Sequence, residues 1–290
     1  MSISWIKLLR PHQWTKNLFC LAGLVFGGKL GNLHEIAKAV LVFCVFCAAS
    51  STVYVVNDIC DLERDRLHPK KRHRPLASGK IGIPLARITA LLLGVLAVTG
   101  AYFSGTKVLS CLLLYGALNA GYSVAFKHLA LLDVACIGIG FILRLLAGVY
   151  AVDETPTAWI TLCTFFLALF LGFSKRRTEL AQMKKSGTDQ RPVLTHYTVP
   201  LLDSIIQSTA TMAIMCYALF TAISGKNPTL IVTVPIVHYG IMRYKLLLLS
   251  VTGAEEPDRI LLKDRGIRTS VLLWVLIYLT IVYLDPHLFR

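Results

Sequence analysis

The chain has 290 residues, of which 55% are hydrophobic and only 16% are charged, and its mean hydropathy is +0.63. This composition is too apolar for a soluble domain or a disordered protein, and it predicts an all-α, multi-pass integral membrane protein. The formal net charge of +14 would suit a nucleic-acid partner, but no basic segment carries interleaved aromatic residues. We therefore expect no nucleic acid.

Nine apolar windows of roughly the length that a transmembrane helix needs follow one another along the chain. They cover residues 14–31, 38–57, 84–104, 107–125, 130–151, 156–174, 199–222, 229–248 and 269–285. Only Gly105 and Thr106 separate the third window from the fourth, which predicts a tight helical hairpin. We expect one membrane domain over residues 1–290, with about nine helices around a central cavity that opens to the cytoplasm. Polar segments near 58–80, 176–198 and 249–268 are expected to cap it.

The distribution of basic residues predicts the orientation of the chain. If the N-terminus is cytoplasmic, 24 of the 30 Lys and Arg fall on the cytoplasmic side and five on the opposite side. The remaining one, Arg144, lies inside a predicted span. By the positive-inside rule this asymmetry predicts a cytoplasmic N-terminus in an inner membrane. All the informative loops then lie on the cytoplasmic side.

A dense polar segment follows the second window, between Asn57 and Pro75. Asp58, Asp61 and Asp65 are spaced three and four residues apart, so a helix would place their carboxylates on one face. Adjacent anions need a cation, and oxygen ligands with open positions suit Mg²⁺, which also takes waters and substrate phosphates. The basic run that follows would hold the rest of a phosphorylated substrate. We expect Lys71 and Arg74 to serve that purpose.

Other candidate site residues lie in or next to the remaining cytoplasmic segments. Arg144 is the exception, because a charge inside a span costs about 2.5–3.5 kcal/mol on insertion scales and must face a cavity or a partner. A substrate role for Arg144 and a structural pairing, with a carbonyl or Asp133, both stay open. The other candidates are Lys16, Asn17, Asn57, Tyr122, Lys127, Lys175, Arg176, Arg177 and Glu179.

The motif Asn57-Asp58-x-x-Asp61-x-x-x-Asp65 resembles the hallmark of the UbiA superfamily of intramembrane prenyltransferases. Further segments are similar to one branch, the decaprenyl-phosphate phosphoribosyltransferases, over most of the chain. They are Arg10-Pro11-x-Gln13-Trp14-x-Lys16-Asn17, His68-Pro69-x-Lys71-x-x-Arg74-Pro75, and Tyr122-Ser123 with Lys127 and Asp133. Ordinary members carry a second Asp-rich motif after the sixth helix. Here Lys175, Arg176 and Arg177 with Glu179 stand in that place, which favours a bare phosphate over a second metal.

The resemblance implies Mg²⁺-dependent transfer of the 5-phosphoribosyl group from 5-phosphoribosyl 1-diphosphate (PRPP) to a polyprenyl phosphate, with release of pyrophosphate. It implies that Asp58 and Asp61 act with Mg²⁺, completed by Asp65, and that Tyr122 and Lys127 belong to the catalytic set. The lipid tail would lie between helices in the bilayer, with its phosphate near Lys16 and Asn17, and Lys175 to Arg177 are a further option for that phosphate. The sequence leaves open which cations bind the lipid and which bind the sugar. The sequence leaves the isoprenoid length open, and also whether the chain forms a homo-oligomer.

Two other functions stay open from the sequence. One is transfer of a prenyl group from a prenyl diphosphate to an aromatic acceptor, against which the basic residues at 175–177 argue. The other is a transporter. Transporters place ionisable residues near the bilayer midplane, whereas here Arg144 alone is central. The sequence therefore favours the phosphoribosyltransferase.

Overall fold

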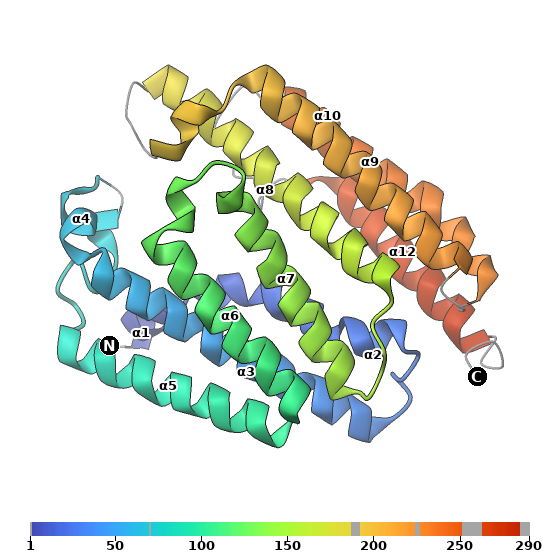
Figure 1. Ribbon diagram of the computed structural model, residues 1–290, viewed down its shortest axis with the longest axis horizontal. Coiled ribbons are helices and arrows are strands. Elements are labelled where there is room, and N and C mark those ends of the chain that lie inside the picture. Colours follow the sequence, from blue (N-terminus) through green and yellow to red (C-terminus); the bar gives the residue numbers. More distant parts are fainter. Residues whose placement is uncertain (1, 70, 187–191, 224–226, 251–262, 285–290) are drawn as a thin grey trace. The chain divides into compact units, whose positions relative to one another are not determined.

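The computed structural model describes residues 2–69, 71–186, 192–223, 227–250 and 263–284 (Figure 1). Every regular element in these ranges is helical, which confirms the all-α prediction. The chain divides into two compact units. Unit 1 comprises Met1–Val124 and Leu143–Pro156, and unit 2 comprises Ala125–Ile142 and Thr157–Arg290. Helix α7 (Leu132–Ala151) contributes its first part to unit 2 and its second part to unit 1.

Unit 1 is built around the long helix α3 (Leu33–Cys60), which packs along α5 (Ile83–Phe103) and against the 3₁₀ helix η1 (Pro11–Leu21). Phe46 and Tyr115 contribute to its apolar core. A tight turn joins α5 to α6 (Thr106–Val124), as the sequence predicts. Gly105 has φ +113° in that turn, a conformation that favours glycine. The unit also contains α1 (Ser2–Leu9), α2 (Ala22–Phe26), α4 (Leu62–Leu67) and η2 (Lys71–His73).

The second part of α7 lies against η1 at one very close approach. A Cβ atom added to Gly148 would lie 1.8 Å from the carbonyl oxygen of Cys20, so the two backbones meet where no side chain fits. Small residues permit such close packing of helices in membranes. This contact fixes the N-terminal segment, including Asn17, beside the helices that carry the polar motif.

Unit 2 is organised around α8 (Ala158–Ser186) and α9 (Val199–Ile223), which pack along each other. Its core includes Phe170, Leu202, Ile206 and Tyr244, and Val134 joins from the start of α7. The remaining elements are η3 (Phe126–His128), η4 (Pro192–His196), η5 (Pro228–Thr233), α10 (Val234–Ser250) and α12 (Arg265–Leu284). The 3₁₀ helices η3 and η4 pack against each other, which places Lys127 beside the segment before α9.

Seven helices in the described residues are long and apolar enough to cross a membrane, so the count of nine is not confirmed. The window at 14–31 forms η1 and the short α2, because Pro11 starts a 3₁₀ helix rich in polar residues. The window at 107–125 forms α6, which is not among the seven. Polar residues such as Lys107, Ser110 and Asn119 lower its hydropathy.

The predicted cap segments lie partly outside the described residues. Within 58–80, the described residues include the end of α3, α4 and η2, and residue 70 lies outside the description. In the segment 176–198, α8 continues to Ser186 and η4 follows, while residues 187–191 lie outside the description. Residues 251–262 of the third segment also lie outside it. A single domain with three cytoplasmic caps stays a prediction.

Candidate active site

The acidic motif lies at the junction of α3 and α4. Helix α3 ends at Cys60, and Asp61 has φ −92° and ψ 8° at the break. The Asp61 N–H still donates to the Asn57 carbonyl, and the Asp65 N–H donates to the Asp61 carbonyl. The helical spacing is therefore nearly continuous through the break, so Asp58 and Asp65, two turns apart, lie on the same side of the chain.

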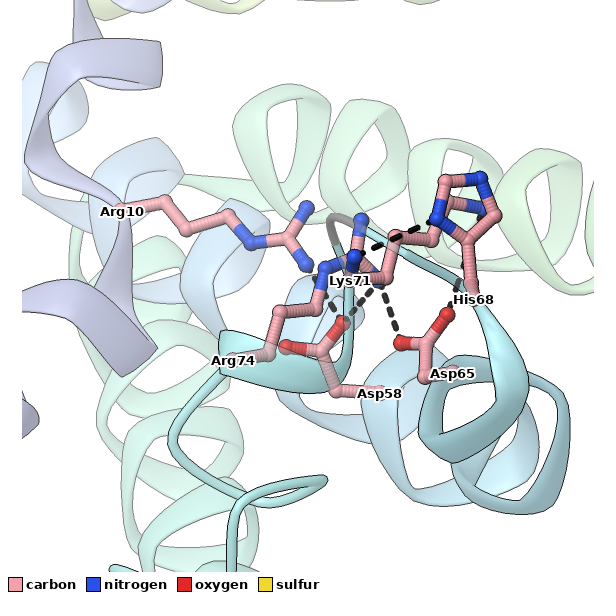
Figure 2. Close-up of polar contacts among 6 residues, drawn as sticks. All are labelled: Arg10, Asp58, Asp65, His68, Lys71 and Arg74. Atoms are coloured by element: carbon pink, nitrogen blue, oxygen red, sulfur yellow. Dashed lines mark hydrogen bonds and ion pairs between the residues drawn. The ribbon is translucent and has the colours of Figure 1, made fainter.

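Asp58 and Asp65 are both buried, at 3% exposure each, and they share one cation (Figure 2). Arg74 Nη1 lies 3.1 Å from Asp58 Oδ1 and 2.6 Å from Asp65 Oδ2. Arg10 Nη2 also donates to Asp58 Oδ1, and Lys71 Nζ lies 4.0 Å from Asp65 Oδ1. The sequence predicted that Lys71 and Arg74 bind substrate phosphates near these carboxylates, and the structure places both cations beside Asp58 and Asp65.

The three aspartates do not all converge on one point. Among the described residues the Asp61 side chain makes no hydrogen bond or ion pair, and no group of three His, Cys, Asp or Glu side chains is arranged to hold a metal ion. Proteins usually hold Mg²⁺ through only one or two carboxylates, with waters and substrate phosphates as the other ligands. Asp58 and Asp65 fit that donor set, and Asp61 stays a predicted ligand.

Arg10 joins this cluster although sequence reasoning did not place it there. It is the N-cap of η1, with φ 54° and ψ 58°, a left-handed conformation that is uncommon for a residue with a side chain. Its guanidinium lies over the Tyr54 ring, 5.1 Å from the ring centroid, and also donates to Asp58. Such conformations persist where the surroundings hold them, often at functional sites. No local pattern signals this pairing, because 48 positions separate Arg10 from Asp58.

Asn57 directly precedes Asp58, and Tyr122 lies near the end of α6 in the same unit. Ser123 Oγ donates to Asn57 Oδ1 at 2.8 Å, which ties the end of α6 to the end of α3. Tyr122 precedes Ser123 and is half-buried. The hydrogen bond therefore fixes the position of Tyr122 near the acidic motif, and its catalytic role stays a prediction.

Asn17 has a different environment from the one that the sequence suggested. It is fully buried, its Nδ2 donates to Ser50 Oγ and Cys47 Sγ, and its Oδ1 accepts from Arg144 Nε at 2.7 Å. Arg144 Nη2 also donates to Tyr115 Oη at 2.9 Å, and the guanidinium lies over the Tyr115 ring. These contacts make Asn17 and Arg144 a network that joins η1, α3, α6 and α7. In this structure Asn17 orients Arg144, and its contact with a substrate stays a prediction.

In unit 2, Arg176 is only 2% exposed and lies between two carboxylates. Its Nε donates to Asp133 Oδ2 at 2.7 Å, and its Nη1 donates to Glu179 Oε2 at 2.6 Å. Tyr197 Oη donates to the other Asp133 oxygen and accepts from the Leu131 N–H. Burial, more than the neighbouring Asp133 charge, raises the pKa of Tyr197 to about 12, so its hydroxyl stays protonated and able to donate. This network connects the start of α7 to α8.

The other two basic residues of the cluster at 175–177 differ from each other. Arg177 is paired with Asp203 of α9, whereas Lys175 is exposed. The folded chain thus neutralises two of the three cations with Asp133, Glu179 and Asp203. The two arginines are thus engaged within the protein, and the binding of a bare phosphate by this cluster stays a prediction. Lys175 and the half-buried Lys127 of η3 stay predicted phosphate ligands.

Comparison with known proteins places the chain in a family. Residues 17–262 match the UbiA prenyltransferase family. The chain belongs to the UbiA prenyltransferase family. It is 33% identical to a decaprenyl-phosphate phosphoribosyltransferase of Corynebacterium glutamicum, over 97% of this chain and 87% of that protein. A protein of the same name from Mycolicibacterium smegmatis is 32% identical, over 93% of this chain and 89% of the relative.

A solved UbiA structure has the same fold. A UbiA homolog from Archaeoglobus fulgidus, bound to GPP and Mg²⁺, gives a TM-score of 0.74 at 20% identity, over 97% of this chain and 98% of that one. This likeness confirms the all-α membrane fold of the family. Together with the seven apolar helices, it makes this UbiA chain an integral membrane protein.

Proposed function

We propose that this chain transfers the 5-phosphoribosyl group of PRPP to a polyprenyl phosphate of the decaprenyl type and releases pyrophosphate. The observation that supports this most is the identity above 30%, over nearly the whole chain, to proteins named decaprenyl-phosphate phosphoribosyltransferase. The cluster of carboxylates and cations in unit 1 supplies groups of the kind that the reaction needs. Its buried aspartates and partly exposed basic side chains suit a bound diphosphate.

The donor diphosphate would bind at Arg74, Lys71 and Arg10. Arg74 and Arg10 are partly exposed, and their planar guanidinium groups form paired hydrogen bonds with phosphate oxygens. Lys71 is more exposed and adds a point charge. These cations would stabilise the negative charge that develops on pyrophosphate as the bond to the ribose anomeric carbon breaks.

Asp58 and Asp65 are the proposed Mg²⁺ ligands, with Asp61 beside them. When bound there, Mg²⁺ would neutralise the departing diphosphate and orient it. The carboxylates are held by helices and shielded from solvent, so their positions are fixed before the substrate arrives. Solved UbiA homologs bound to Mg²⁺ and to Cd²⁺ share the fold, which supports a divalent metal here.

The acceptor needs little chemical activation. Its phosphate has a second pKa of about 6, so an anionic oxygen is available at neutral pH without a general base. That oxygen would form a bond to the anomeric carbon while the bond to pyrophosphate breaks, through an oxocarbenium-like transition state. Lys16, Lys127 and Lys175 are the proposed phosphate ligands outside the carboxylate cluster. Asn57, Tyr122 and Ser123 would define the edge of the donor site.

The setting of the reaction is also part of the proposal. The isoprenoid tail explains why the site belongs to a membrane protein, because only a bilayer keeps a long prenyl chain accessible. We place the N-terminus and the reaction on the cytoplasmic side of an inner membrane, from the distribution of Lys and Arg. The product would serve cell-envelope biosynthesis, and assembly into a homo-oligomer stays open.

The test follows label from PRPP into lipid. Purified protein in nanodiscs with Mg²⁺ and polyprenyl phosphate should move radiolabel from PRPP into the lipid phase, and EDTA should abolish the transfer. A parallel reaction with prenyl diphosphate and 4-hydroxybenzoate is the control for the alternative function. Formation of the aromatic product alone would show that the chain is a conventional prenyltransferase.

A further inference from the structure

The buried carboxylates of the acidic motif already have cationic partners within the protein. Asp58 accepts from both Arg10 and Arg74, and Asp65 accepts from Arg74 with Lys71 at 4.0 Å. Three cations therefore surround two anions (Figure 2). A divalent metal arriving alone would meet a cluster that is already neutralised, and it would be repelled by the guanidinium groups.

The anions and the cations of this cluster are held differently. Asp58 and Asp65 lie on α3 and α4, and their side chains are 4% exposed. Arg10 precedes η1 and Arg74 follows η2, so both lie at the ends of short elements, and their side chains are 21% and 30% exposed. The carboxylates have fixed positions, whereas the guanidinium groups have solvent on one side into which they can turn.

We propose that Arg10 and Arg74 act as exchangeable counter-ions, which hold the carboxylates until a diphosphate arrives and then move onto its phosphates. The diphosphate supplies the anions that the arginines need, and the carboxylates are freed for the metal. Metal and diphosphate then bind cooperatively, each strengthening the other by the same factor. This inference rests on the proposed function only in taking a diphosphate as the ligand.

The first test measures Mn²⁺ binding to the purified wild-type protein by electron paramagnetic resonance, with and without pyrophosphate. Matched solutions without protein give the signals of free and pyrophosphate-bound Mn²⁺, so that the protein-bound fraction can be determined. We expect pyrophosphate to tighten Mn²⁺ binding to the protein by at least about tenfold. The reason is that moving one unit of positive charge away from carboxylates at such short range changes their affinity for a metal ion by more than this factor. Equal Mn²⁺ affinity with and without pyrophosphate would overturn the proposal.

The second test removes the shared counter-ion. Arg74→Gln should tighten Mn²⁺ binding in the absence of pyrophosphate by about tenfold, since Asp58 and Asp65 lose a neutralising charge. Arg66→Gln is the matched control, because Arg66 pairs with the exposed Glu63 on α4 and lies outside the cluster. Unchanged or weaker Mn²⁺ binding by a folded Arg74→Gln variant would contradict the exchange. If that variant does not fold, the Mn²⁺ affinities of the wild-type protein with and without pyrophosphate still test the proposal.

These measurements separate the inference from the proposed reaction. Cooperative Mn²⁺ and pyrophosphate binding without any transfer from PRPP would remove the proposed function and leave the exchange standing. Transfer from PRPP without cooperative binding would remove the exchange and leave the function. The Mn²⁺ and pyrophosphate binding measurements need no lipid acceptor.

Discussion

Asp58→Asn should lower the rate of phosphoribosyl transfer by at least about 10²–10³-fold, the loss typical when a group that stabilises developing charge is removed. The asparagine keeps the shape of the side chain but loses the charge that holds Arg10, Arg74 and the proposed metal. Initial rates of label transfer from PRPP, measured at saturating Mg²⁺, check the effect. Arg74 keeps Asp65 as its partner, so the protein is expected to stay folded.

Glu63→Gln is the control for this substitution. It removes one negative charge from α4 at a side chain that is 81% exposed and pairs only with Arg66 among the described residues. Its transfer rate should stay within about twofold of the wild type, because exposed pairs contribute little. An Asp58→Asn variant that is folded in nanodiscs and turns over at the wild-type rate would exclude Asp58 from the active site.

Arg176→Met should destabilise the protein by about 3–5 kcal/mol, the cost of breaking a buried ion pair by removing one partner. Arg176 is 2% exposed, and its loss leaves Asp133 buried with only the Tyr197 hydroxyl to donate to its carboxylate among the described residues. Denaturant or thermal unfolding of the purified protein in detergent measures the change in free energy. Methionine fills much of the same space, so the loss of charge is the main variable.

Lys175→Met tests whether this effect belongs to the buried pair. It makes the same change in charge one residue earlier, at a side chain that is exposed, and it should change stability by less than about 0.5 kcal/mol. If both variants unfold alike, the Arg176 network does not stabilise the protein. If Arg176→Met keeps wild-type stability but loses activity, Arg176 contacts substrate as the sequence suggested.

The sequence predicts that Asp58 and Asp65 lie together because this signal is local, whereas Asp61 does not join their ion pairs among the described residues. Spacings of three and four residues place Asp58 and Asp65 on one side of a helix, and Arg74 follows within nine positions of Asp65. Arg10 is invisible to such reasoning, because its approach to Asp58 depends on the packing of η1 against α3. The same segment also meets α7 at the close contact between Gly148 and Cys20.

The basic residues at 175–177 make contacts that the sequence does not reveal. As a sequence they look like a positive patch, since Glu179 is the single acid nearby. Their partners come from other helices, with Asp133 43 positions from Arg176 and Asp203 26 positions from Arg177. Tertiary contacts therefore turn part of a positive run into ion pairs, of which the Arg176–Asp133 pair is buried, and net charge along the chain cannot predict this.

The length of an apolar window predicts that a helix forms there, whereas individual residues decide whether it is an α-helix or a 3₁₀ helix. Six of the nine windows lie almost wholly within long α-helices that are apolar enough to span a membrane. The window that starts at residue 14 begins instead in the 3₁₀ helix η1, which carries several polar residues that make side-chain contacts. Trp14 donates to Ser51 there, and Asn17 contacts Arg144.

The most direct test of the proposed reaction is the mass of the lipid product. Purified wild-type protein, incubated with PRPP, Mg²⁺ and a polyprenyl phosphate of defined length, should yield a lipid heavier by one phosphoribosyl group, together with one pyrophosphate for each lipid modified. A lipid of unchanged mass, recovered from protein that is folded and binds Mn²⁺ with pyrophosphate, would contradict the assignment as a polyprenyl-phosphate phosphoribosyltransferase.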